Sequence, residues 1–113
     1  MKLELEKIAP QIVMGLKDGE GEAQLQPYDD GVVRTLIITL KPGSYIGGHV
    51  HEGNCEVMYI ISGRGVMKYD DGEEELLPGD VHYCPEGHFH SLANAGSEDL
   101  VLLAVLPVSP KKA

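Results

Sequence analysis

Apolar residues in this chain gather in short runs that glycine and proline separate. Residues 32–40 (VVRTLIITL) are rich in β-branched side chains and end at Pro42-Gly43, which predicts a strand followed by a turn. Further strands are predicted at residues 56–61, 65–69, 73–77, 81–84, 90–93 and 100–106. The sequence Asp70-Asp71-Gly72 separates two of these segments and is a strong hairpin signal.

Many short strands at close spacing, with turn signals between them, predict an all-β sandwich or barrel. The run at 100–106 (LVLLAVL) is too apolar to face water on either side, so we expect it to lie centrally in a sheet. The best helix candidate, residues 7–16, is weakened by Pro10 and Gly15, so at most one short helical turn is expected near the N-terminus. Because no linker interrupts the pattern, we predict a single domain over residues 1–113, ending in a short polar tail.

Composition narrows the class of protein. A length of 113 residues, 42% hydrophobic and 24% charged, fits one globular core without a disulfide. Nine basic against 18 acidic residues give a net charge of -9, which would repel nucleic acid and an anionic membrane surface. Plain solubility is the main alternative explanation of this acidity. We therefore expect neither nucleic acid nor a membrane as a partner.

The N-terminal segment MKLELEKIAP carries four charges and no apolar run long enough for a signal peptide or a membrane span. It predicts a cytoplasmic, reducing location, in which Cys55 and Cys84 would remain thiols. Cys55 stands beside a glutamate and could be a zinc ligand, but a small buried residue is the favoured interpretation of both cysteines.

The segment GSYIGGHVHEGNCE, residues 43–56, places two histidines and a glutamate in a glycine-rich stretch. Residues i and i+2 of a strand point to the same side, so we expect His49 and His51 to face together. Glu56 opens the next predicted strand, and a hairpin would bring it back beside the two imidazoles. Two neutral imidazoles and a carboxylate suit a divalent transition metal, although an isolated His-x-His pair is more often an ordinary polar loop.

Two spacings occur in order along the chain. Residues 43–63 follow G-x5-H-x-H-x4-E-x6-G, and residues 79–94 follow G-x5-P-x-G-x2-H-x3-N, with His90 as the histidine of the second pattern. Together these segments resemble the two signature motifs of the cupin superfamily. The resemblance implies a double-stranded β-helix, or jelly-roll β-barrel, with a metal-binding core at about residues 32–106. It also implies one metal ion, with the ligands His49, His51, Glu56 and His90.

Four protein ligands on an octahedral ion leave two positions for substrate, water or oxygen, and the ligand set suits iron, manganese, nickel, cobalt, copper or zinc. The ligand set resembles that of quercetinase-like cupin dioxygenases, which implies a metal-dependent enzyme acting on a small organic molecule, with Glu56 as a possible base. A non-oxidative isomerase, lyase or decarboxylase is the alternative, and a non-catalytic ligand-binding module is a third. Small cupins commonly pair, so a homodimer is expected, in which the apolar outer face and the sheet edges are covered.

Four further side chains could lie near the barrel interior and contact a substrate. Arg34 and Lys68 could hold a substrate carboxylate, but a solvated outer face is favoured for both. His82 is interpreted as exposed or as a packing residue. His88 forms a second His-x-His pair with His90, but the preceding Pro85–Gly87 turn places it before the strand, at the barrel mouth, where it could meet a substrate.

Overall fold

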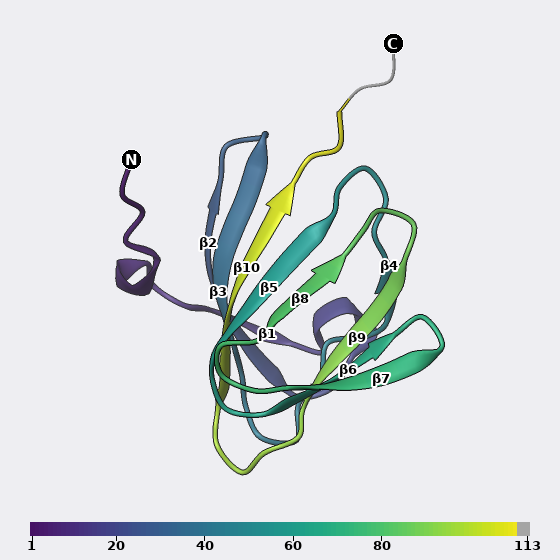
Figure 1. Cartoon of the computed structure of the whole chain (residues 1–113). Helices are drawn as coiled ribbons and strands as arrows, with labels where there is room; N and C mark the ends of the chain where they lie inside the picture. Colours follow the sequence, from purple (N-terminus) through teal and green to yellow (C-terminus); the bar gives the residue numbers. More distant parts are fainter. Residues whose placement is uncertain (111–113) are drawn as a thin grey trace.

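The chain folds into two antiparallel β-sheets that pack face to face, as the computed structural model shows (Figure 1). The structure describes residues 1–110, and residues 111–113 of the predicted polar tail lie outside the described residues. The elements are η1 (Leu5–Lys7), β1 (Gln11–Met14), η2 (Leu16–Asp18), β2 (Glu22–Asp29), β3 (Val33–Leu40), β4 (His49–Val50), β5 (Glu56–Ser62), β6 (Gly65–Tyr69), β7 (Gly72–Leu76), β8 (Val81–Cys84), β9 (Phe89–Asn94) and β10 (Leu100–Pro107). The fold is the predicted jelly-roll β-barrel.

The larger sheet has the strand order β1-β2-β3-β10-β5-β8, and the smaller sheet has the order β4-β9-β6-β7. Strand β10 lies between β3 and β5, with Leu102 opposite Ile38 on one side and Ile60 on the other. The central position predicted for this apolar strand is therefore confirmed. Hydrogen bonds on both edges satisfy its backbone, so a strand with little polar side-chain character can be buried.

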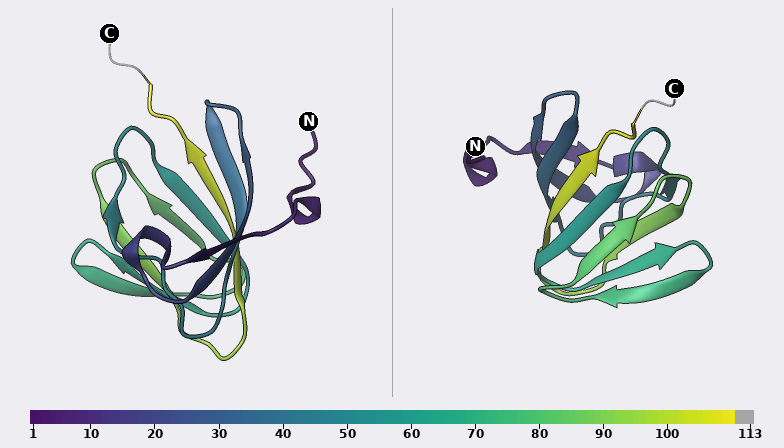
Figure 2. Two further views of the ribbon diagram at one scale, coloured as in Figure 1. Left: turned by 180° about the vertical axis from the view of Figure 1, so that it is seen from behind. Right: turned by 45° about the horizontal axis from the view of Figure 1, so that its top comes forward.

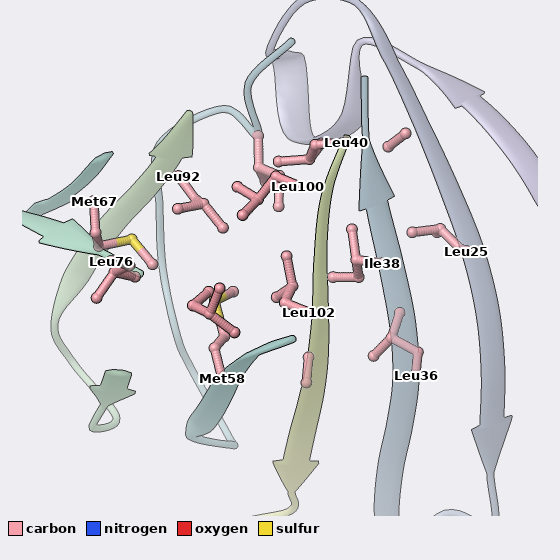
Figure 3. Close-up of a cluster of buried hydrophobic side chains, with 14 residues drawn as sticks. Leu25, Leu36, Ile38, Leu40, Met58, Met67, Leu76, Leu92, Leu100 and Leu102 are labelled. Atoms are coloured by element: carbon pink, nitrogen blue, oxygen red, sulfur yellow. The ribbon is translucent and has the colours of Figure 1, made fainter. Parts of the chain in front are cut away.

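The hydrophobic core fills the space between the two sheets. Leu36 and Ile38 of β3, with Leu102 of β10, point toward Met67 and Leu92 of the smaller sheet (Figure 3). Alternate residues of each strand share a face, so one set of side chains enters this core while the intervening set faces outward. The core holds the two sheets in a fixed relation, and this relation positions every residue of the site described below.

The N-terminal region differs from the prediction. Residues 7–16 contain no α-helix; two 3-10 turns, η1 and η2, flank the short strand β1. Pro10 precedes β1, whose residues pair with β2 from Gln11 opposite Leu25 onward. Strand β2 was also not predicted, because polar residues on its outward face make it weakly apolar. Backbone pairing at a sheet edge outweighs the weak local preference for helix in this segment.

The predicted β6–β7 hairpin is present, with Tyr69 opposite Gly72 and Asp70 in the left-handed region at φ 48°. Both cysteines are free thiols, Cys84 buried as predicted and Cys55 only partly buried. Among residues 1–110, no helix combines the length and the apolar character that crossing a bilayer requires.

Candidate metal centre

The four residues predicted as ligands come from both sheets. His49 on β4 lies directly opposite His90 on β9 in the smaller sheet, whereas Glu56 opens β5 in the larger sheet. The loop at 51–55, with His51 at its start, crosses from one sheet to the other (Figure 1). The predicted hairpin between the histidine strand and Glu56 is therefore wrong: β4 pairs with β9, and β5 pairs with β8 and β10. The barrel, rather than a local turn, brings the carboxylate to the imidazoles.

The side chains of these residues converge through their outer atoms. The Nε2 atom of His51 lies 2.9 Å from His90 Nε2 and 3.0 Å from Glu56 Oε1. The Nε2 atom of His90 also lies 3.1 Å from His49 Nε2 and 3.1 Å from Glu56 Oε1. Metal bonds of about 2.0–2.2 Å place adjacent ligand atoms of an octahedral ion about 3 Å apart. The four ligand atoms thus have the spacing of ligands around one ion, and the group could hold a metal.

Hydrogen bonds to the Nδ1 atoms of His49 and His51 determine which nitrogen of each ring carries a proton. The Nδ1 atom of His49 is 2.8 Å from the carbonyl oxygen of Gly47, and the Nδ1 atom of His51 is 2.8 Å from Oδ1 of Asn54. Both oxygens accept, so both Nδ1 atoms carry a proton, and whenever these rings are neutral both Nε2 atoms present lone pairs to the cluster. Lone pairs that face one another repel unless a cation lies between them, so this donor set fits a metal ion.

The carboxylate of Glu56 is buried and ionised. Burial alone would raise the pKa of Glu56, but hydrogen bonds that His51 and His90 donate from Nε2 when their rings are protonated, together with the positive charge of those rings, outweigh burial and lower the pKa to about 2. The hydrogen bond to Glu56 in turn raises the pKa of His51, whereas burial lowers the pKa of His49. An ionised carboxylate with so low a pKa is a ready metal ligand and a weak general base near neutral pH.

A fifth residue, His82 on β8, contacts the cluster from outside, through the outward nitrogen of His90. Its side chain is buried rather than exposed, with Nε2 3.1 Å from Nδ1 of His90 and Nδ1 2.6 Å from Oε1 of Glu74. Burial lowers the pKa of His82, although its hydrogen bond to Glu74 opposes that change. The sequence could have indicated that His82 is buried. His82 lies two residues before Cys84 on the same strand, so the two side chains share one face, and Cys84 is predicted to be buried.

His88 stands outside the cluster, in the turn before β9, as the Pro85–Gly87 turn predicted. Its Nδ1 atom lies 2.7 Å from Oδ2 of Asp70 and 3.2 Å from the hydroxyl oxygen of Tyr69. Among the described residues, the wall of the cavity beside the cluster does not include His88. Its predicted position at the mouth of a substrate site is therefore wrong; the ring faces the β6–β7 turn instead.

A cavity of about 540 Å³ adjoins the cluster, and His49, His51 and Glu56 form part of its wall. Most of the remaining wall is apolar and includes Leu25, Leu36, Ile38, Ile46, Met58 and Leu106. Ligand pockets typically combine such apolar walls with a few convergent polar groups. The cluster therefore faces a space in which a small molecule could reach it.

Two cationic side chains line this cavity. Arg34 is exposed, but it lies on the same face of β3 as Leu36 and lines the cavity, so its predicted position on the outer face is wrong. Lys68, in contrast, is exposed and lies away from the cavity, as predicted. Lys17 comes from η2, and its positive charge opposes the rise in the pKa of His51. Both cations can therefore act on an anion in the cavity.

The η2 turn is held against the segment that leads into β4 (Figure 2). The N–H of Gly47 donates to the carbonyl oxygen of Leu16 over 3.0 Å, and a Cβ atom on Gly47 would collide with the carbonyl oxygen of Lys17. Lys17 and Asp18 both adopt left-handed backbone angles, at φ 55° and 63°, which non-glycine residues adopt at a cost. Gly47 thus allows a strained turn to hold Lys17 at the cavity.

Comparison with known proteins gives a match to a protein family and several similar sequences and structures. Residues 36–106 match the family described as Cupin domain. An oxalate-binding protein of Thermotoga maritima is 33% identical over 107 residues, covering 88% of each chain. The crystal structure of a predicted oxalate decarboxylase from Thermotoga maritima superposes with a TM-score of 0.90 at 30% identity, covering 96% of this chain and 100% of the other. The oxalate decarboxylase of Bacillus subtilis is 32% identical over 78 residues, which span 65% of this chain and 20% of that protein. The chain therefore belongs to the cupin superfamily.

Proposed function

We propose that this protein binds one divalent transition metal ion through His49, His51, Glu56 and His90, and that the loaded centre binds a small organic anion in the adjacent cavity. The observation that carries the proposal is the convergence of three imidazole nitrogens and a buried, ionised carboxylate within 4.8 Å of one another. The outward hydrogen bonds of His49 and His51 support it, because they turn the free lone pairs inward.

A carboxylate is the anion that the site favours. When bound, a divalent ion would supply a Lewis-acidic positive charge, and Glu56 as its one anionic ligand would leave a net charge of about +1. Lys17 and Arg34 add positive charge at the same cavity, whose wall also includes the carboxylates Asp29 and Glu52. The relatives named for oxalate binding and oxalate decarboxylation support a carboxylate as the bound group. We infer that the anion is held by the metal at one end and by Lys17 near the cavity rim.

The cavity also limits the size of the anion. A volume of about 540 Å³ lies within the range of about 300–1,000 Å³ that is typical of small-molecule pockets. The apolar part of its wall can cover a hydrocarbon body, while Lys17 and Arg34 offer cationic partners. The shape therefore favours a carboxylate with an apolar portion at least as much as oxalate itself.

Decarboxylation is the second candidate function, favoured by the similarity to the oxalate decarboxylase of Bacillus subtilis. The dioxygenase activity predicted from the sequence stays a prediction, because the same ligand set serves oxidative and non-oxidative chemistry. Glu56 as a general base is less favoured, since its lowered pKa of about 2 leaves it a poor proton acceptor near neutral pH. Metal identity, measured by elemental analysis of protein purified without added metal, would separate these chemistries: iron or copper favours oxygen chemistry.

Replacing His90 tests the ligand set against its nearest neighbour in sequence. We expect His90→Ala to lose most of the metal that the wild type retains after loading and desalting, because a central donor atom is removed. His88→Ala should keep nearly full occupancy, since His88 contacts Asp70 and not the cluster. Elemental analysis gives the occupancy, and circular dichroism checks that both variants are folded. Equal losses in folded protein, or a loss confined to His88→Ala, would contradict the assignment.

Lys17→Met tests the anion site separately from the metal site. In the metal-loaded protein, we expect the affinity for oxalate and for benzoate to fall about two- to fivefold, the size of an effect from one exposed charge. Metal affinity itself should not fall, because Lys17 is no ligand. Lys68→Met is the matched control, since Lys68 is exposed and lies away from the cavity. If both variants bind the anions with the same affinity, Lys17 has no part in binding.

We also propose that two copies pair through the outer face of the larger sheet. Tyr59 and Ile61 of β5 and Val81 and Tyr83 of β8 are between 45% and 62% exposed, and Tyr59 lies opposite Val81 in the ladder. Exposed apolar patches of this kind commonly mark protein interfaces. The wild type is expected to sediment as a dimer at micromolar concentration and Tyr83→Glu as a monomer. Val32→Glu, at an apolar position outside β5 and β8 that is 71% exposed, should remain dimeric; a monomeric wild type would refute the proposal.

A further inference from the structure

The histidine at the centre of the cluster does not share the outward contacts of the other two. His49 and His51 each donate their Nδ1 proton to an oxygen, which can only accept. The Nδ1 atom of His90 instead faces Nε2 of His82 at 3.1 Å, and a ring nitrogen can be either a donor or an acceptor. This contact alone therefore leaves open whether the lone pair of His90 points into the cluster or away from it.

The next contact along the chain of hydrogen bonds removes that freedom. The Nδ1 atom of His82 lies 2.6 Å from Oε1 of Glu74, and a carboxylate only accepts. The Nδ1 atom of His82 must then carry a proton, which leaves Nε2 of the neutral ring as an acceptor. Nδ1 of His90 must donate to it. Nε2 of His90 lies 3.1 Å from Oε1 of Glu56, so it carries a second proton when the ring is cationic, but in the neutral ring, which metal binding requires, the lone pair is left on Nε2 and faces the other ligands.

We propose that Glu74, acting through His82, is a positioning residue that fixes the ring of His90 in the tautomer able to bind a metal. This inference rests on the proposed metal site, since it concerns how one of its ligands is prepared. The arrangement is built into the fold: His82 and His90 are 3% and 1% exposed and their rings stack at 5.3 Å between centroids. Glu74 reaches His82 from β7, and its side chain is 47% exposed. Among the described residues, His82 is the only ion-pair partner of Glu74.

The position of Glu74 makes the inference testable without disturbing the core. Its side chain is half-exposed, so a substitution there leaves no cavity, whereas changing the buried His82 would. Glu74→Lys replaces the acceptor by a group that only donates, which reverses each hydrogen bond and leaves the proton of His90 on Nε2. Glu74→Gln keeps an acceptor oxygen. Glu73→Lys is the matched control: it makes the same charge change on the same strand, on the other face of the sheet, where the residue lies opposite Lys68.

Two measurements are made on the full chain: Zn²⁺ affinity by titration calorimetry, and the protonated ring nitrogen of His90 by nitrogen-15 NMR of metal-free protein. We expect Glu74→Lys to bind Zn²⁺ about ten- to a hundredfold more weakly than Glu73→Lys, as is typical when the partner of a metal-binding histidine is lost. At a pH at which the ring of His90 is neutral, the NMR spectrum should show it protonated on Nδ1 in the wild type and on Nε2 in Glu74→Lys. Glu74→Gln should resemble the wild type in both measurements.

The outcomes distinguish this inference from the function on which it rests. A wild type that binds no Zn²⁺ would contradict the proposed metal site itself. A wild type that binds Zn²⁺, with Glu74→Lys and Glu73→Lys equally weakened, would overturn only the role of Glu74. A loss of affinity in Glu74→Lys without a change of the protonated nitrogen of His90 would also overturn it, because charge alone would then account for the loss.

Discussion

The constraint on which this structure depends is that three imidazole lone pairs and one carboxylate oxygen must meet at a single buried point. Each of these groups would be better solvated in water, and lone pairs brought together repel. The protein meets the constraint in two ways: it assembles the groups from different strands of a barrel, and it gives the outward nitrogen of each ring a partner. Gly47, Asn54 and His82 are those partners.

Residues from both sheets form this cluster. The smaller sheet supplies His49 and His90 as a directly opposed pair, and the larger sheet supplies Glu56 at the start of β5. The core between the sheets, centred on Leu102 and its neighbours, keeps the carboxylate about 3 Å from two of the rings. On one side the cluster faces an apolar cavity lined in part by Lys17, and on the other it leads through His82 to the surface at Glu74.

Much of this could be predicted from the sequence, because the informative features are local. The bounds of β6 and β8 are those predicted, since turn residues end both strands, and the spacing of the two motifs indicates all four residues of the cluster. The sequence could not show that Glu56 comes from the opposite sheet, because strand pairing between distant segments has no local signal. The weakly apolar β1 and β2 were not predicted for the same reason, because their pairing with each other and of β2 with β3 stabilises them.

For two other side chains, the alternation of faces along a strand indicates a position that the prediction for Arg34 did not give and that the prediction for His82, as exposed or as a packing residue, left open. Arg34 shares a face with Leu36, which enters the barrel, and His82 shares a face with the buried Cys84. In both cases the general preference of a charged or polar side chain for solvent was given more weight than its position on the strand. Polar residues at inward-facing strand positions are where a functional site departs from that preference: His82 contacts His90 of the cluster, and Arg34 lines the adjoining cavity.

The most direct test of the account is the affinity of the protein for a divalent ion with and without the charge of Glu56. Titration calorimetry with Zn²⁺ should show one ion bound per chain in the wild type. Glu56→Gln, which keeps the shape of the side chain but removes its charge, should bind at least about tenfold more weakly, since the only anionic ligand is lost. The absence of stoichiometric binding, or equal affinity in the two proteins, would show that the cluster is a buried hydrogen-bond network and not a metal centre.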